Sequence, residues 1–478
     1  MFAFAIWDAR QRRLLVARDR LGIKPLYFSS NQQRFAFASV PQSLYPLGDI
    51  STDFDPAGLH HHLTLHAVVP APRTIFRDIR KIKPAHYYWV NESGDVTEHR
   101  YWNLHARRPA EQRSEEDWLE GLTDALMLSV RRRKEIADVP VGILLSGGLD
   151  SSLLVGLLTR AGVADLKTFT VGFDDQPEEA GNEFEYSDAV AKQYGTDHHQ
   201  FLVDNDQLLR RLPEAINAMA EPVVGQDAIG FYLLSEQVSK QVKVVQSGQG
   251  ADEVFGGYFW YPQMHEADNE DDLQRFASRY FDRSHENWQA TIDPRWHCGD
   301  VTSELVSQLL ADADADEYID RVLHMDVTTL IVDDPVKRVD NMTMAWGLEA
   351  RVPFLDHELV EYAAMMPVDL KLRDGGKFAL KAISRGIVPD AVIDRKKGYF
   401  PVPALKYIRG ETLDFMQDAL NSSACRNRGL FRREQVDLLL SEPDQHYTRL
   451  RGSRLWHLAL LEMWLQQQDR ILANPHTV

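Results

Sequence analysis

The first 28 residues alternate apolar and polar positions in a way that predicts an antiparallel hairpin. Phe2, Phe4 and Ile6 alternate with alanines, a polar turn follows at residues 8–11, and residues 14–17 form a second apolar run. Because the pattern begins at residue 1, the opening segment resembles a strand from the middle of a sheet. This start raises the question of whether a further segment once preceded it.

A second pattern begins at residue 118, where apolar residues recur at helical spacing as far as residue 134. Beyond it, short apolar runs alternate with helical segments, and these runs are VPVGILL, LKTFTVGF, HHQFLV and KVVQ. This alternation predicts a parallel sheet with helices on both faces. After residue 258 the pattern is mostly helical, and residues 455–467, apolar on all sides, predict a packed closing helix.

Composition narrows the choice of function. A hydrophobic content of 44% with 26% charged residues is ordinary for a globular protein, and no apolar run approaches the roughly 18 residues that span a bilayer. The formal charge of −18 argues against nucleic acid or an anionic membrane as a partner. Since no secretory leader pattern is present, we expect a cytoplasmic protein. Cys298 and Cys425 are too few for a disulfide framework, so we expect structural or incidental roles for them.

The stretch LLSGGLDSS, residues 144–152, lies between an expected strand and an expected helix. Its glycines let backbone N–H groups turn inward, its serines add hydroxyl donors, and the helix N-terminus adds a positive dipole end, which together suit a phosphate. No Gly-Lys-Ser/Thr follows, so this is not a Walker loop. The alternative, a glycine turn with a serine cap, is disfavoured by the length of the motif.

A second glycine loop, SGQGADEVFGGY, follows the expected strand KVVQ at residues 247–258. Gly248 and Gly250 permit close backbone approach, while Asp252 and Glu253 offer carboxylates to a metal ion. Loops at the carboxyl ends of parallel strands share one crevice, so we expect both glycine loops to face the same ligand. A simple helix-capping turn is the alternative for this loop taken alone.

His60, His61, His62 and His66 raise the question of a metal site, because His62 and His66 lie four apart on an expected helix. No carboxylate or cysteine at ligand spacing supports such a site. Surface or packing roles are therefore favoured for these histidines.

Several ordered motifs together resemble the synthetase domain of the glutamine-dependent asparagine synthetase family. The motifs are LLSGGLDSS, TFTVGF, GTDHH, SGQGADEVFGGY, LEARVPFLDHELVE, GKFALKAI and VPDAVIDRKKGYFPVP. The resemblance implies a Rossmann-like parallel sheet of the adenine nucleotide alpha-hydrolase (ATP pyrophosphatase) type with a helical C-terminal part, over residues 118–478. Residues 1–102 resemble the second half of the family's α+β, Ntn-hydrolase-like glutaminase domain, and the polar residues 103–117 are expected to be a linker.

The resemblance also implies a reaction and a site. An acceptor carboxylate attacks the α phosphate of ATP to give an acyl-adenylate and pyrophosphate, and ammonia then attacks the acyl carbon. The implied ATP-binding residues, with Val171 near adenine, are Leu145, Ser146, Gly147, Gly148, Asp150, Ser151, Ser152, Val171, Ser247 and Gly248. Asp150 and Asp252 would hold Mg²⁺, and Lys377, Lys397 and Arg395 would supply catalytic cations.

The glutaminase half of the family depends on residues that this sequence lacks. Members of the family begin Met-Cys-Gly-Ile, with the cysteine as nucleophile, and an Asn-Gly-Glu stretch completes their glutamine pocket. Neither occurs here. We therefore expect a truncated chain without glutaminase activity of its own, and the nitrogen could come from glutamine or from free ammonium.

Two departures from the family pattern concern the acceptor. Gln249 stands where asparagine synthetases typically have Glu in SGEG, and an amide cannot take the proton that attacking ammonia must lose. Glu253, Glu349 or solvent could substitute, or the acceptor could differ from aspartate. Ala220 also replaces the usual Asp of Asp-Glu-Pro. The variant loops resemble the branch that amidates N-acetylglutaminylglutamine, which is the alternative to aspartate.

A rival hypothesis of another class is an inactive ATP-binding fragment, or one that recruits a separate glutaminase subunit, because half a glutaminase domain exposes sheet edges. A homodimer is left open.

Overall fold

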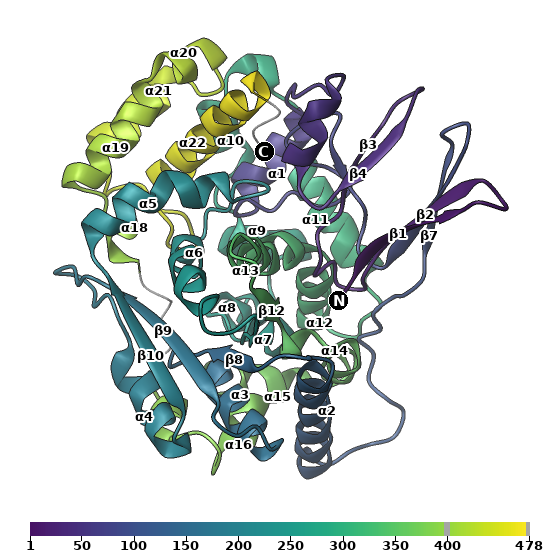
Figure 1. Cartoon of the computed structure of the whole chain (residues 1–478), viewed down its shortest axis with the longest axis vertical. Helices are drawn as coiled ribbons and strands as arrows, with labels where there is room; N and C mark the ends of the chain where they lie inside the picture. Colours follow the sequence, from purple (N-terminus) through teal and green to yellow (C-terminus); the bar gives the residue numbers. More distant parts are fainter. Residues whose placement is uncertain (396–401, 475–478) are drawn as a thin grey trace.

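The computed structural model describes residues 1–395 and 402–474 (Figure 1). A five-stranded parallel sheet lies in its lower half, in the spatial order β10-β9-β8-β11-β12. The strands are β8 (Val141–Leu144), β9 (Lys167–Phe173), β10 (Asp197–Val203), β11 (Val244–Gln246) and β12 (Glu349–Arg351). The direction of winding reverses between β8 and β11, and ligands of open α/β sheets bind outside the carboxyl ends of the strands at such a point.

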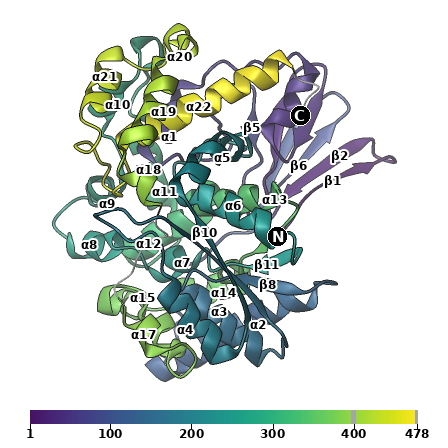
Figure 2. The same cartoon turned by 60° about the vertical axis from the view of Figure 1, so that its left-hand side comes forward.

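Helices cover this sheet on both faces, as the sequence predicts. In Figure 2, α2 (Glu115–Glu135), α3 (Leu149–Arg160) and α4 (Phe184–Tyr194) lie on one side of the strands, with α5 (Asn205–Asn217) and α6 (Asp227–Val238) on the other. Burial on both faces explains why β8 and β9 read as continuous apolar runs rather than alternating ones.

Helix α2 begins earlier than the apolar pattern indicates. The Ser114 side chain accepts a hydrogen bond from the backbone N–H of Asp117, and the Asp117 carboxylate accepts one from the N–H of Ser114. This capping box adds a polar first turn that carries no hydrophobic signal. Ahead of it, Leu104 and Ala106 are buried, and Ala106 forms a β-bridge with Ala315.

Residues 1–102 form two antiparallel sheets, of order β1-β2-β6-β7 and β4-β3-β5. The strands are β1 (Ala3–Asp8), β2 (Arg13–Arg18), β3 (Tyr27–Ser30), β4 (Phe35–Ala38), β5 (Arg80–Lys81), β6 (His86–Asn91) and β7 (Val96–Arg100). The predicted first hairpin is confirmed, with register from Ala3 opposite Arg18 to Asp8 opposite Arg13. The placement of β1 inside a sheet is wrong, because β1 is an edge strand on which Ile6 is 54% exposed.

The remainder of the chain is mostly helical, as predicted. Its helices are α7 (Ala251–Phe255), α8 (Trp260–Glu266), α9 (Asp272–Tyr280), α10 (His285–Thr291), α11 (Val301–Asp312), α12 (Tyr318–Met325), α13 (Lys337–Met344), α14 (His357–Ala364), α15 (Val368–Leu372), α16 (Phe378–Ser384), α17 (Asp390–Ile393), α18 (Pro403–Lys406), α19 (Gly410–Asn421), α20 (Ser423–Arg428), α21 (Arg433–Ser441) and α22 (Arg454–Ala473). Within residues 1–395 and 402–474, no helix combines the length and apolar character needed to cross a membrane.

The closing helix α22 is buried along most of its length, which confirms the predicted packing role. It packs against α19 and also reaches residues 1–102. There Tyr45 donates to the Gln468 side chain at 2.9 Å, and the ring of Phe76 stacks on Trp464 at 5.8 Å between centroids. The helical region therefore shares its main hydrophobic core with the sheet β4-β3-β5, to which Tyr27 belongs. The sheet β1-β2-β6-β7 contributes Val16 and Tyr88 to a smaller, separate cluster.

A buried ionic group, which we call the four-charge cluster, also joins these parts of the chain. Lys81, Glu221, Asp333 and Lys337 form it, and each is at most 5% exposed. Lys81 Nζ lies 2.6 Å from Asp333, Lys337 Nζ lies 3.0 Å from Glu221, and the Tyr27 hydroxyl donates to Glu221 at 2.9 Å. Two cations balance two anions, so the cluster is neutral.

Candidate active site

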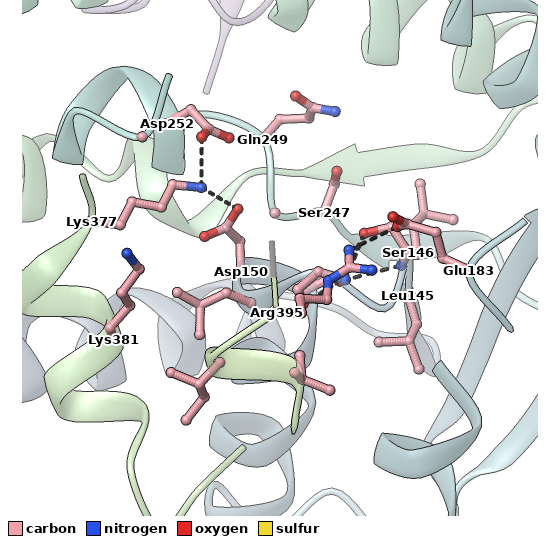
Figure 3. A pocket seen from close by; sticks show the side chains of 18 of the residues that line it. Leu145, Ser146, Asp150, Glu183, Ser247, Gln249, Asp252, Lys377, Lys381 and Arg395 are labelled. Carbon is pink, nitrogen blue, oxygen red and sulfur yellow. Dashed lines mark hydrogen bonds and ion pairs between the residues drawn. The ribbon is translucent and has the colours of Figure 1, made fainter. Parts of the chain in front are cut away.

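A cavity of about 760 Å³ opens at the carboxyl edge of the parallel sheet, where β8 and β11 lie side by side. Its walls come from the loop after β8, the middle of β9, the loop after β11, residues 374–395, and side chains of α6 and α13. Figure 3 shows the labelled polar side chains of these segments gathered around it. The cavity thus occupies the position that the strand order favours for a ligand.

The first glycine loop connects β8 to α3 and presents backbone donors to the cavity. Gly147 has φ +76°, and a Cβ there would lie 3.0 Å from the backbone nitrogen of Ser187, so a side chain at this position would be strained. Gly148 is the N-cap of α3 and supplies no side-chain cap to the first turn. The Ser146 and Ser151 hydroxyls lie 3.1 Å apart across the loop. Uncapped N–H groups, hydroxyls and the helix dipole form an anion cradle.

The second glycine loop connects β11 to α7 and touches the first. A Cβ on Gly248 would lie 3.1 Å from both the Cβ of Asp150 and the backbone nitrogen of Ser151. Gly250 has φ +93°, and a Cβ there would lie 2.5 Å from the Leu355 side chain. The missing side chains let both loops face one cavity, as the topology predicts.

Lys377 connects the two loops electrostatically. Its Nζ lies 2.6 Å from Oδ2 of Asp150 and 2.8 Å from Oδ1 of Asp252, as Figure 3 shows. Burial alone would lower the pKa of Lys377, but the charges of Asp150 and Asp252 outweigh it and raise the pKa above its usual value. The ammonium is therefore charged and balances two carboxylates that converge on one point.

Arg395 supplies a second cation near the first loop. Its Nη2 lies 2.8 Å from Oε2 of Glu183, and its guanidinium lies 4.3 Å from the ring centroid of Tyr186. Figure 3 places it beside Ser146. Lys397, the other cation expected in this segment, lies outside the described residues.

The cavity wall contains most of the residues that the sequence singles out. Those that line it are Leu145, Ser146, Gly148, Asp150, Ser151, Val171, Ser247, Gly248, Asp252, Lys377 and Arg395. Three others stand behind the wall: Gly147 at the turn, and Ser152 and Glu253, which are at most 2% exposed.

Glu253 is linked to the cavity by a hydrogen bond from one hydroxyl group. Tyr258 lines the cavity and donates a hydrogen bond to Oε1 of Glu253 at 2.6 Å. Burial, followed by the charges of Asp252 and Asp326, raises the pKa of Glu253 to about 8. Near neutral pH this carboxyl group is therefore largely protonated.

The cavity also contains polar residues that the sequence analysis missed. Lys381 lies one helical turn beyond Lys377, and this i, i+4 spacing in GKFALK was an available signal. Asp227 and Arg338 also line the cavity and form an ion pair at 3.1 Å. They come from α6 and α13 and share no local motif, so only the fold brings them together.

The two residues that depart from the family pattern, Gln249 and Ala220, lie in different parts of the structure. Gln249 lines the cavity and is drawn in Figure 3. The segment at residues 220–222 is not part of the cavity wall: Ala220 is buried, and Glu221 belongs to the four-charge cluster. The substitution at Ala220 therefore gives no direct evidence about the acceptor.

Fold and site together define an α/β protein with a polar cavity at the switch point of a parallel sheet. Residues 121–466 match the asparagine synthase family, and residues 1–102 match the glutamine amidotransferase domain. The chain therefore belongs to the asparagine synthase family.

Its relatives include proteins named as asparagine synthetases. Asparagine synthetase [glutamine-hydrolyzing] 1 of Bacillus subtilis (strain 168) is 29% identical over 460 residues, which cover 88% of this chain and 71% of that protein. A putative asparagine synthetase [glutamine-hydrolyzing] of Mycobacterium tuberculosis (strain ATCC 25618 / H37Rv) is 30% identical over 509 residues, which cover 97% and 76%. A protein named Amidase chyE of Penicillium rubens is 28% identical over 472 residues, which cover 83% and 69%.

Proposed function

We propose that the chain is an ATP-dependent amidoligase, which activates a carboxylate as an acyl-adenylate and converts it to a carboxamide with ammonia. The observation that carries the proposal is the meeting of two glycine loops at Gly248, with Lys377 held between Asp150 and Asp252. The sheet order supports the ATP pyrophosphatase type of α/β fold for this part. The match of residues 1–102 supports an Ntn-hydrolase-like arrangement there.

The cavity offers separate regions for the parts of ATP. The amides and hydroxyls around Ser146 and Ser151 suit the β and γ phosphates, and the apolar side chains of Val171, Phe231 and Leu234 suit the adenine. Asp150 and Asp252 fit Mg²⁺, because two carboxylates already converge on one cation there, and hard oxygen ligands are those that Mg²⁺ prefers. Bound there, Mg²⁺ would neutralise charge on the departing pyrophosphate.

The reaction proceeds in two displacements. An oxygen of the acceptor carboxylate bonds to the α phosphorus, and the bond from that phosphorus to the β-phosphate oxygen breaks. Ammonia then attacks the acyl carbon, the acyl–oxygen bond to AMP breaks, and a proton leaves the nitrogen. Lys377, Lys381 and Arg395 line the cavity, where their charges oppose the negative charge of the phosphates and the acyl oxygen.

The proton released by ammonia needs an acceptor, and the amide of Gln249 is not one. We assign this role to Glu253, acting through the Tyr258 hydroxyl that connects it to the cavity. Glu253 accepts a proton only when it is ionised, so this step should become faster as the pH rises toward about 8, the pKa of Glu253.

The state of the two cysteine thiols argues against glutamine hydrolysis and therefore favours free ammonium as the nitrogen donor. Burial raises the pKa of Cys298 to about 11 and that of Cys425 to about 12. Both groups are thus protonated near neutral pH, whereas hydrolysis of glutamine by this chemistry needs an activated thiol. We therefore propose no glutaminase activity for these 478 residues.

Aspartate is the acceptor that the cavity supports best. The Asp227–Arg338 pair offers a carboxylate and a guanidinium to the α-ammonium and α-carboxylate of an amino acid. Gln249 favours N-acetylglutaminylglutamine as the second candidate, because its side-chain amide can pair with the amides of that dipeptide.

Release of pyrophosphate tests this function directly. The purified chain receives ATP, Mg²⁺ and ammonium, with aspartate or N-acetylglutaminylglutamine in parallel reactions and glutamine as the alternative donor. Acceptor-dependent release with ammonium supports the proposal, and the preferred acceptor decides between the two substrates. If the folded chain binds ATP but releases no pyrophosphate with either acceptor, the inactive-fragment hypothesis replaces it.

A further inference from the structure

Outside the cavity, two imidazoles and one carboxylate from three separate helices meet at one point. His60 lies on α1 (Pro56–Thr64), His285 is the first residue of α10, and Asp300 is the N-cap of α11. Their potential ligand atoms all lie within 4.8 Å of one another. In Figure 1 these helices lie above the parallel sheet, and none of the three residues lines the cavity formed by the two glycine loops.

The distances within this group suit a tetrahedral metal ion. Nε2 of His60 lies 2.9 Å from Nδ1 of His285 and 3.8 Å from Oδ1 of Asp300. Zinc–ligand bonds of about 2.0–2.1 Å place the ligand atoms of a tetrahedral site roughly 3.3 Å apart. Since the two measured distances bracket that value, small side-chain movements would bring all three atoms around one ion.

The surroundings hold His60 in the orientation of a metal ligand. Its other ring nitrogen, Nδ1, lies 2.5 Å from the hydroxyl of the buried Thr302. Metal-binding histidines are typically oriented by such a partner on the nitrogen that faces away from the metal. Trp288 packs on both rings, with centroids 4.6 Å from His60 and 5.9 Å from His285.

The site is accessible to ions from solvent, because the Asp300 side chain is 39% exposed and His285 is half-buried. Two imidazoles and one carboxylate form a donor set that zinc accepts, whereas Mg²⁺ prefers oxygen ligands. We propose that His60, His285 and Asp300 bind one zinc ion, with water as the fourth ligand. His60 comes from residues 1–102, and its two partners come from the region matched to the asparagine synthase family. The bound ion would therefore crosslink these two regions.

The test is zinc binding by the full chain without an affinity tag, after removal of metals with a chelator. Zn²⁺ is titrated against a chromophoric competitor in excess Mg²⁺, which occupies oxygen-only sites. H285A and D300N are the test variants, because both positions are partly exposed and asparagine retains the capping oxygen of Asp300. H446A is the matched control, since His446 forms an exposed pair with Glu442 at 3.1 Å.

We expect the wild type and H446A to bind one equivalent more tightly than H285A and D300N, by at least tenfold. Zn²⁺ should also raise the thermal unfolding midpoint of the wild type and H446A but not of the two test variants. If H285A fails to fold, D300N alone decides the outcome. Equal zinc affinity in the wild type and the folded test variants would overturn the proposal.

Discussion

Removal of the Lys377 ammonium should destabilise the protein and make its stability depend on magnesium. In K377M, Asp150 and Asp252 lose the cation that now lies 2.6 and 2.8 Å from their oxygens. Each contact is worth about 6 kcal/mol before desolvation, at an effective dielectric constant of about 20. Breaking a buried pair costs about 3–5 kcal/mol net. Since the two carboxylates are 19% and 18% exposed, we expect the lower end, about 3 kcal/mol.

Thermal or chemical unfolding in EDTA and in Mg²⁺ measures this effect. Mg²⁺ should restore much of the lost stability in K377M, because the divalent ion replaces the cation that the substitution removes from between the two carboxylates, and should stabilise the wild type much less. K381M is the matched comparison: Lys381 lines the same cavity, and its Nζ donates to the backbone carbonyl of Asp374 at 2.8 Å. Unchanged stability of K377M in EDTA, or equal stabilisation of all three proteins by Mg²⁺, would refute the reasoning.

Three further substitutions test other parts of the structure. E221Q leaves the two lysines of the four-charge cluster with one carboxylate. It should therefore lower the free energy of unfolding, measured by chemical denaturation, by about 3–5 kcal/mol. An unchanged free energy of unfolding would contradict the assigned pairing. E253Q should gain stability relative to the wild type as the pH rises from about 5 to 8. The raised pKa of Glu253 means that its protonated form stabilises the native wild type, and this contribution is lost with rising pH; a pH-independent difference would be inconsistent with it. G250A should lower the free energy of unfolding by about 3 kcal/mol, because the residue has a positive φ and its Cβ would clash with Leu355. G162A, at a position with positive φ and open space around it, should lower it by only about 1 kcal/mol. Equal losses in the two variants would rule out the clash.

The parallel sheet and its two glycine loops could be predicted because local patterns specify them. Buried strands such as β8 are continuous apolar runs, and a glycine-rich turn between strand and helix marks a phosphate cradle. The position of β1 in its sheet could not be predicted, since alternation identifies a strand but not its neighbours. The predicted helix starting at Trp118 missed its first turn because the capping box there is polar.

The site residues that could not be predicted are brought together by contacts between segments that lie far apart in the sequence. The Asp227–Arg338 pair and the group of His60, His285 and Asp300 carry no spacing signal, because each partner comes from a different helix. The fold supplies the carboxylate and second imidazole that the run of histidines lacks in sequence.

The central claim is that this chain makes an acyl-adenylate and amidates it with ammonia. The most direct test is a single measurement of positional isotope transfer, with the purified chain, ATP, Mg²⁺, ammonium and aspartate labelled with ¹⁸O in its side-chain carboxylate. One ¹⁸O atom is expected in the AMP that is released, because the carboxylate oxygen bonds to the α phosphorus before ammonia displaces AMP. Amide formation with the label found in inorganic phosphate, or with unlabelled AMP, would contradict it.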